Sequence, residues 1–156
     1  MPVELTLTRV FDAPRELVFA AWTDPRHVAQ WWGPRGFTTP VCEMDVRPGG
    51  KVFIVMRGPD GTENPTHGVL DEVVVPERLV MSAAGFEDEA GTPRFEVRNT
   101  VTFTEQDGKT LLTLHALVLK ATPEMEPALT GMRQGWTETL DRLGEFLAAG
   151  AYHAEP

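Results

Sequence analysis

The sequence predicts an α+β fold in which a curved antiparallel sheet of about seven strands wraps a long C-terminal helix, with two short helices after the first strand. Three observations predict it. Apolar and polar residues alternate with a period of two from Phe37 to about Lys120. Glycine and proline turns separate these segments at hairpin spacing. An apolar stripe of helical period follows Pro127.

The N-terminal part predicts one strand followed by two short helices. Val3–Phe11 alternates apolar and polar residues, as a strand with one buried face does. Pro14 stands where a helix would begin, since proline is tolerated in a first helical turn. Asp24-Pro25 ends this helix and opens a second one, and the run Gly33-Pro34-Arg35-Gly36 stops the second.

Six further strands are expected in the middle of the chain. The separators include Pro48-Gly49-Gly50, Pro59-Asp60-Gly61 and Gln106-Asp107-Gly108, which are turn sequences. Hairpin connections of this length join antiparallel neighbours, so the sheet should be antiparallel throughout. The expected strands are Phe37–Arg47, Val52–Arg57, Thr66–Val75, Arg78–Phe86, Phe95–Thr104 and Thr110–Leu119.

The last element has the strongest pattern. From Pro127 onward, large apolar residues recur at steps of three and four, and Gly150 ends the helix. We expect one domain over residues 1–150 and a C-terminal tail over residues 151–156. The apolar stripe should be buried against the concave face of the sheet. It consists of Leu129, Met132, Trp136, Leu140, Leu143 and Leu147.

An apolar pocket is expected beside this helix, because a long bent sheet has more concave surface than one helix fills. Gly131 and Gly135 lie one turn apart on the helix, where alanine would favour helicity by about 1 kcal/mol each. Their missing side chains leave either close backbone contact or pocket volume. Alternation turns Asn99 inward, and Phe53 and Val55 are also assigned inward. The expected pocket residues are Trp32, Met44, Phe53, Val55, His67, Met81, Val97, Asn99, Val101, Phe103, Leu114, Met132, Trp136 and Leu140.

No catalytic or metal-binding constellation is expected. The four histidines never pair at metal-ligand spacing, and Cys42 has no cysteine companion. An inward apolar position makes Cys42 a buried small hydrophobe. The run Arg47-Pro48-Gly49-Gly50-Lys51 lacks the spacing of a phosphate loop and is typical of a hairpin turn. We therefore expect no catalytic residue, no metal and no cofactor.

Two polar residues leave more than one interpretation open. His67 lies at the start of a strand, at the expected pocket mouth, where it would bind a ligand, act as a general base, or be a partly exposed strand histidine. Asn99 is expected to be buried, and a buried amide needs hydrogen-bond partners. A ligand is one candidate partner for it.

Composition limits the classes of partner. The chain has 14 basic and 23 acidic residues, a formal net charge of −9, and such a surface repels nucleic-acid phosphates. No segment approaches the roughly 20 apolar residues of a membrane helix. The start Met1-Pro2-Val3-Glu4 predicts no secretion signal. One cysteine precludes an internal disulfide and favours a reducing, cytoplasmic location.

Several runs of residues resemble one known family. They resemble bacterial proteins similar to the C-terminal domain of the activator of the heat-shock protein 90 ATPase, within the START-like or polyketide-cyclase-like (SRPBCC) helix-grip superfamily. The resemblance extends from roughly Leu5 to Leu147. It implies a START-like helix-grip domain with a deep pocket between sheet and helix, and it supplies no catalytic residues. The runs are Phe11-Asp12-Ala13-Pro14, Val18-Phe19-Ala20-Ala21-Trp22-Thr23-Asp24-Pro25, Trp31-Trp32-Gly33-Pro34, Asp45-Val46-Arg47-Pro48-Gly49-Gly50, Pro76-Glu77-Arg78-Leu79 and Gly135-Trp136-Thr137-Glu138-Thr139-Leu140.

Three functions follow as hypotheses. The first is binding of a small hydrophobic or amphipathic molecule in the pocket. The second is a co-chaperone-like protein-interaction module whose partner is a chaperone. The third is a polyketide-cyclase-like enzyme in which His67 or Asn99 orients the substrate. Pairing of two copies through an apolar strand edge or the Trp31-Trp32 region would give a homodimer.

Overall fold

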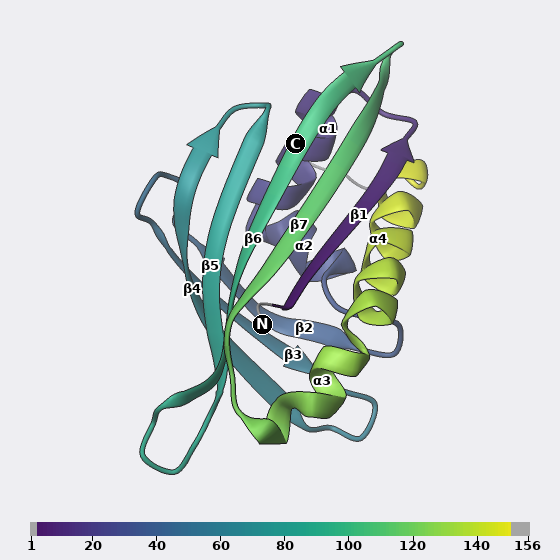
Figure 1. Ribbon diagram of the computed structural model, residues 1–156. Coiled ribbons are helices and arrows are strands. Elements are labelled where there is room, and N and C mark those ends of the chain that lie inside the picture. Colours follow the sequence, from purple (N-terminus) through teal and green to yellow (C-terminus); the bar gives the residue numbers. More distant parts are fainter. Residues whose placement is uncertain (1–2, 151–156) are drawn as a thin grey trace.

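Seven antiparallel strands form one twisted, curved sheet in the order β1-β7-β6-β5-β4-β3-β2, so that neighbours in sequence pair except at the closure of β1 on β7 (Figure 1). The structure is a computed structural model that describes residues 3–150, and the expected tail over residues 151–156 lies outside the described residues. The predicted α+β helix-grip fold is confirmed. The strands are β1 Val3–Phe11, β2 Thr38–Met44, β3 Lys51–Arg57, β4 Glu63–Val74, β5 Arg78–Glu87, β6 Pro93–Gln106 and β7 Lys109–Ala121.

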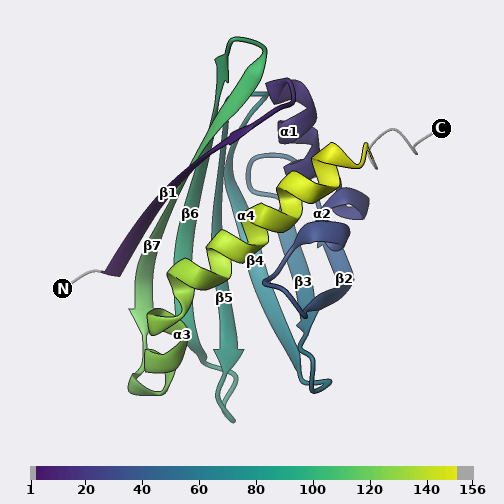
Figure 2. The same ribbon diagram turned by 90° about the vertical axis from the view of Figure 1, so that its right-hand side faces the viewer.

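The helices lie on one side of the sheet, and Figure 2 shows the longest of them crossing the strands diagonally. Asp24 caps the second helix by accepting a hydrogen bond from the Arg26 backbone N–H at 2.9 Å. The C-terminal helix, expected to be continuous from Pro127, is divided at Gly131, where ψ is 0°. Glycine is a weak helix former, so a break falls readily there. The helices are α1 Arg15–Thr23, α2 Pro25–Trp31, the 3₁₀ turn η1 Pro123–Met125, α3 Glu126–Thr130 and α4 Met132–Ala148.

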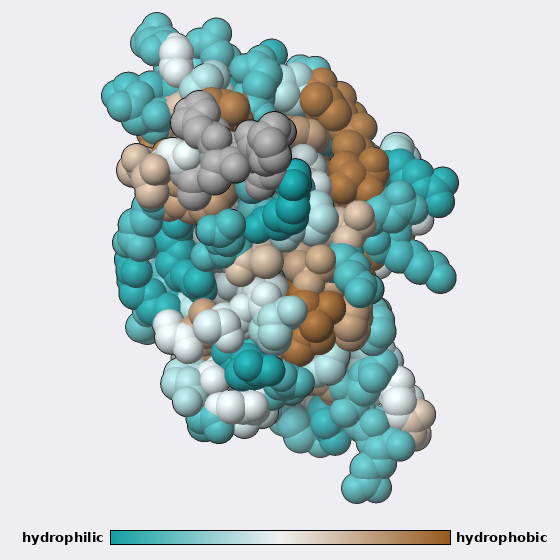
Figure 3. Space-filling view, turned by 180° about the vertical axis from the view of Figure 1, so that it is seen from behind, coloured by the Kyte–Doolittle hydropathy of each residue, from teal (hydrophilic) through white to brown (hydrophobic). Residues whose placement is uncertain are grey.

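The core lies between the sheet and the helices, and the expected inward faces of β6 and β7 are found there. Val101 and Phe103 of β6 and Leu112 and Leu114 of β7 belong to one buried cluster with α1, α2 and α4. Seen from behind, strongly hydrophobic residues gather at the surface only in small separate areas between hydrophilic ones (Figure 3). Most large apolar side chains are buried in the interior.

The inward assignment of Phe53 and Val55 is wrong. Val52 and Ile54 belong to the core cluster, and β3 pairs Ile54 with Cys42, which also packs against the core. Phe53 and Val55 alternate with them and therefore lie on the outer face. The strand is apolar on both faces, so alternation carried no signal there, and only pairing with β2 fixes the face.

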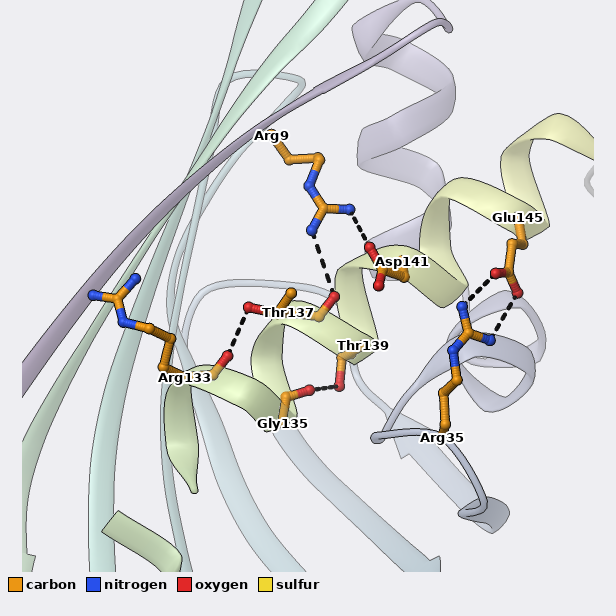
Figure 4. A network of polar contacts seen from close by, with 8 residues as sticks. All are labelled: Arg9, Arg35, Arg133, Gly135, Thr137, Thr139, Asp141 and Glu145. Carbon is orange, nitrogen blue, oxygen red and sulfur yellow. Dashed lines mark hydrogen bonds and ion pairs between the residues drawn. The ribbon is translucent and has the colours of Figure 1, made fainter. Parts of the chain in front are cut away.

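Two ion pairs fix α4 in its place on the sheet (Figure 4). The guanidinium of Arg9 on β1 donates a hydrogen bond to the Asp141 carboxylate at 2.8 Å. Arg35, in the loop before β2, donates to Glu145 at 3.2 Å. The groups of both pairs are partly or largely exposed to solvent, so the ion pairs themselves contribute little stability. Burial of the α4 stripe supplies the stability, and the ion pairs set its position.

Glycines at two positions play opposite roles. A Cβ on Gly50, in the turn between β2 and β3, would lie 1.8 Å from the Asp45 carbonyl oxygen, so this turn requires glycine. A Cβ on Gly135 would meet no heavy atom within 4 Å, and one on Gly131 would meet only the Pro127 carbonyl at 3.5 Å. Close packing therefore does not account for the helix glycines.

Replacement of these glycines should separate the two roles. Gly135→Ala should raise the free energy of unfolding by about 1 kcal/mol, because it favours the helix and meets no neighbour. Gly50→Ala should lower it by more than about 1 kcal/mol, because the backbone must shift. Urea denaturation of both variants measures the difference. Equal effects of the two substitutions would contradict this account of α4 and the turn.

Candidate functional site

A cavity of about 220 Å³ lies between the inner face of the sheet and the helices α3 and α4. Its wall is mostly apolar. Six residues of the expected pocket line it, namely Trp32, Met81, Val97, Asn99, Met132 and Trp136. Eleven lining residues were not foreseen, namely Val52, Ile54, Met56, Thr66, Gly68, Ala83, Ala84, Gly85, Phe86, Phe95 and Ala128.

The cavity exists because small residues occupy the inner positions of β4 and β5 beneath α4. Gly68 on β4 pairs with Ala83 on β5, and Gly85 follows two residues along the same face. A Cβ on Gly68 would lie 2.9 Å from the Ser82 carbonyl oxygen, so the strands approach closely there. Larger residues would fill the space beneath the helix. The sequence signal was the cluster Ala83-Ala84-Gly85 in a strand otherwise rich in larger residues.

Tryptophans form the wall of the cavity nearest the core. The rings of Trp32 and Trp136 meet edge to face with centroids 5.5 Å apart, and Trp22 stacks on Trp136 at 6.2 Å. Trp31 is fully buried and donates its indole N–H to the Ala21 carbonyl at 3.0 Å. Trp31 therefore serves the core, and a dimer contact through the Trp31 side chain is excluded.

Arg142 of α4 holds Trp32 in position, a role that sequence analysis missed. Its Nη1 donates hydrogen bonds to the carbonyls of Trp32 at 3.1 Å and Gly33 at 2.8 Å, just beyond the end of α2. Burial lowers the pKa of the Arg142 guanidinium, but its pKa is so high that the group stays charged. A cation is favourable at the carbonyl end of a helix. The sequence pattern placed Arg142 on the polar side of the helix and gave no signal for this contact.

The inner end of the cavity holds two polar atoms that lack partners. Asn99 is 5% exposed, and its Oδ1 has no hydrogen-bond partner among residues 3–150. Trp22 is 3% exposed, and its Nε1 likewise has none within that range. Both residues line a void of about 10 Å³ next to the cavity. Buried polar atoms without partners are uncommon and call for an explanation.

The mouth of the cavity carries an exposed aromatic ring. Phe86 is 42% exposed, lines the cavity, and lies 6.4 Å from the ring of Phe95. Its φ of 57° is in the left-handed region, which bulky residues rarely adopt. The exposed Ala128 of α3 lines the same cavity.

Several expected pocket residues lie elsewhere. Phe103, Leu114 and Leu140 are almost completely buried in the core and line neither the cavity nor the small void beside it. Val101 and Met44 line the small void instead of the main cavity. These side chains face inward as expected, but α1, α2 and the packed half of α4 cover them.

Phe53, His67 and Val55 lie on the outer face of the sheet. The rings of Phe53 and His67 are 4.8 Å apart in a groove of about 790 Å³. Val55 does not line this groove and is buried between its strand partners Val41 and Pro65. His67 is exposed, whereas Asn99 faces the inner cavity. The expectation that His67 lies at the mouth of the inner pocket is wrong, because the residues of β4 alternate in face.

The chemistry available to the cavity is limited to apolar contact and a few neutral polar groups. None of its 17 lining residues has a titratable side chain. Within residues 3–150, no group of three or more His, Cys, Asp and Glu side chains is arranged to hold a metal ion. No helix in that range is both long enough and apolar enough to cross a membrane.

Comparison with known proteins gives consistent results. The sequence model of the family described as activator of Hsp90 ATPase homolog 1-like protein matches residues 12–148. No curated protein sequence matches the chain. An AHSA1 protein from Silicibacter pomeroyi is 26% identical, with 95% of this chain and 99% of that chain covered and a TM-score of 0.76.

Two further solved structures are similar to this chain. One from Mycobacterium smegmatis is 28% identical, with 92% of this chain and 90% of that chain covered and a TM-score of 0.77. One from Nitrosomonas europaea is 24% identical, with 96% of this chain and 97% of that chain covered and a TM-score of 0.79. This similarity shows that the two proteins share the fold.

The thiol of Cys42 should be unreactive at neutral pH. Burial, with a smaller contribution from Asp24, raises the pKa of the Cys42 thiol from 9.0 to about 11. The neutral thiol then dominates below pH 11, and only the thiolate is nucleophilic. Alkylation by iodoacetamide at pH 8 should be about 100-fold slower than in the urea-unfolded chain, and its rate should rise until about pH 11. A rate that levels off near pH 9 would contradict this.

Removal of the Arg142 guanidinium should loosen Trp32. Arg142→Leu should lower the free energy of unfolding by about 1–2 kcal/mol, because charged hydrogen bonds to the Trp32 loop are lost. Tryptophan emission should shift to the red as the ring gains solvent. Arg133→Leu on the same helix is the control, since in Figure 4 the Arg133 carbonyl, and not its side chain, makes the contact. Equal effects of both variants would exclude a special role of Arg142.

Proposed function

Because the chain belongs to the family of activator of Hsp90 ATPase homolog 1-like proteins, with the START-like fold, we propose that it binds a small hydrophobic or amphipathic molecule in the cavity between the sheet and α4. The observation that carries this proposal is the apolar cavity with no titratable side chain in its wall. Such a wall favours retention of a molecule over acid–base chemistry upon it. The single thiol and the acidic composition are consistent with a cytoplasmic location.

The size and lining of the cavity suit a ligand of one or two rings. A cavity of about 150 Å³ lined by aliphatic and aromatic residues holds benzene, and this one measures about 220 Å³. Apolar burial contributes about 25 cal/mol per Å², so 200 Å² of buried ligand surface gives roughly 5 kcal/mol before the costs of association. Methionine side chains at Met56, Met81 and Met132 can adapt to ligands of different shape.

A polyketide-cyclase-like reaction receives less support. His67 and Asn99 face opposite sides of the sheet, so they cannot orient one bound molecule together. In such a reaction, the shape of the cavity and the Asn99 amide would have to orient the substrate. The alternative with a specific observation in its favour is a protein-interaction module of the co-chaperone type.

The outer groove supports this alternative. Val69 and Leu119 line the groove and are 39% and 47% exposed, next to the Phe53 and His67 rings. Exposed apolar surface of this kind occurs at protein contacts. The measurement is stimulation of a chaperone ATPase by the wild-type chain and by Phe53→Ser. No stimulation by the wild type would remove this alternative.

Filling of the cavity provides the test of the ligand-binding proposal. Ala83→Leu should reduce binding of 2-methylnaphthalene at least tenfold, because the added methyl groups occupy the space beneath α4. Val69→Leu is the control, since Val69 lines the outer groove and not the cavity. Fluorescence titration measures both, and native mass spectrometry of the purified protein detects any molecule retained from the host. Failure of the wild type to bind apolar probes, or equal loss in both variants, would refute the proposal.

A further inference from the structure

The two polar atoms without partners are complementary to each other. The Nε1 of Trp22 on α1 carries a hydrogen to donate, and the Oδ1 of Asn99 on β6 can only accept. Both are buried, and both residues line the same void of about 10 Å³. A group that accepts one hydrogen bond and donates another would satisfy both.

The surroundings of Asn99 offer no substitute partner. Its neighbours across the sheet are Met81 on β5 and Ala116 on β7, which have no polar side-chain atom to donate. The aromatic rings around Trp22 belong to Trp31, Trp32, Trp136 and Phe103. The polar pair therefore lies in an apolar environment, where an unmade hydrogen bond is costly.

The void and the larger cavity share part of their walls. Trp32, Ile54, Met81 and Asn99 line both spaces. A ligand in the cavity can thus extend a small group towards Trp22 and Asn99. The void has about the volume that one water molecule needs, so it admits a group the size of a single oxygen.

From this arrangement we propose that the ligand of the cavity carries a hydroxyl group, which accepts a hydrogen bond from Trp22 Nε1 and donates one to Asn99 Oδ1. This rests on the proposed ligand-binding function and names the class of ligand. A hydroxyl is neutral and both donates and accepts. A carbonyl would leave Asn99 Oδ1 unpaired, a carboxylate would repel it, and an ammonium group would be charged in an apolar site.

A series of three probes of similar shape tests the proposal on the wild-type protein. 2-Naphthol can donate and accept, 2-methoxynaphthalene can only accept, and 2-methylnaphthalene can do neither. 2-Naphthol should bind about tenfold more tightly than each of the other two. The indole N–H resonance of Trp22, assigned with Trp22→Phe, should move on addition of 2-naphthol and not of 2-methylnaphthalene.

Two variants test whether Asn99 causes the preference for 2-naphthol. Asn99→Leu, close in size, should abolish the preference for 2-naphthol and leave 2-methylnaphthalene affinity within about twofold. Thr66→Val is the matched control, because it removes the only hydroxyl side chain in the cavity wall and should keep the preference.

The outcomes separate the two proposals. Equal affinities for 2-naphthol and 2-methoxynaphthalene in the wild type, as when a bound water already satisfies both atoms, would overturn the hydroxyl inference alone. A preference that survives Asn99→Leu would also overturn it. Failure of all three probes to bind the wild type would refute the ligand-binding function itself.

Discussion

The uneven fit of α4 against the sheet determines the rest of this structure. The C-terminal half of the helix presses Leu140, Leu143 and Leu147 into the core, where each is at most 7% exposed. The N-terminal half instead places Met132 and Trp136 over the small residues of β4 and β5, and a cavity remains between them. A well-packed half can hold the helix rigidly while the other half spans open space, because interior packing is close wherever it is complete.

The sheet divides the molecule into two chemically different sides. The inner side contains the tryptophan wall, the apolar cavity and the amide of Asn99, without a titratable group in the cavity wall. The outer groove contains histidine, lysine and carboxylates beside exposed apolar residues. The proposed ligand-binding function and the alternative protein-interaction function would therefore use separate faces of the sheet.

The sequence predicts the fold well and the site in part, for reasons visible in particular residues. The strict alternation of β6 and β7 turned Asn99 and Val101 inward, as found, whereas the two-sided apolar strand β3 carried no such signal and Phe53 was misplaced. Helical period showed where α4 lies, but it could not show how far the packing extends along it. Arg142 was missed because its partners are backbone carbonyls more than 100 residues away in sequence, which no local pattern encodes.

The backbone at Phe86 has a consequence for the lifetime of any complex. Holding a bulky residue at a φ of 57° costs of order 1–3 kcal/mol, and glycine would avoid this cost. The chain has phenylalanine at this position instead, and its aromatic ring lies at the rim of the cavity. A ring at the entrance obstructs departure as much as arrival, so it slows both rates and leaves their ratio nearly the same. The strained residue would then govern the residence time of the proposed ligand, and a smaller side chain at this position would let the ligand exchange faster at similar occupancy.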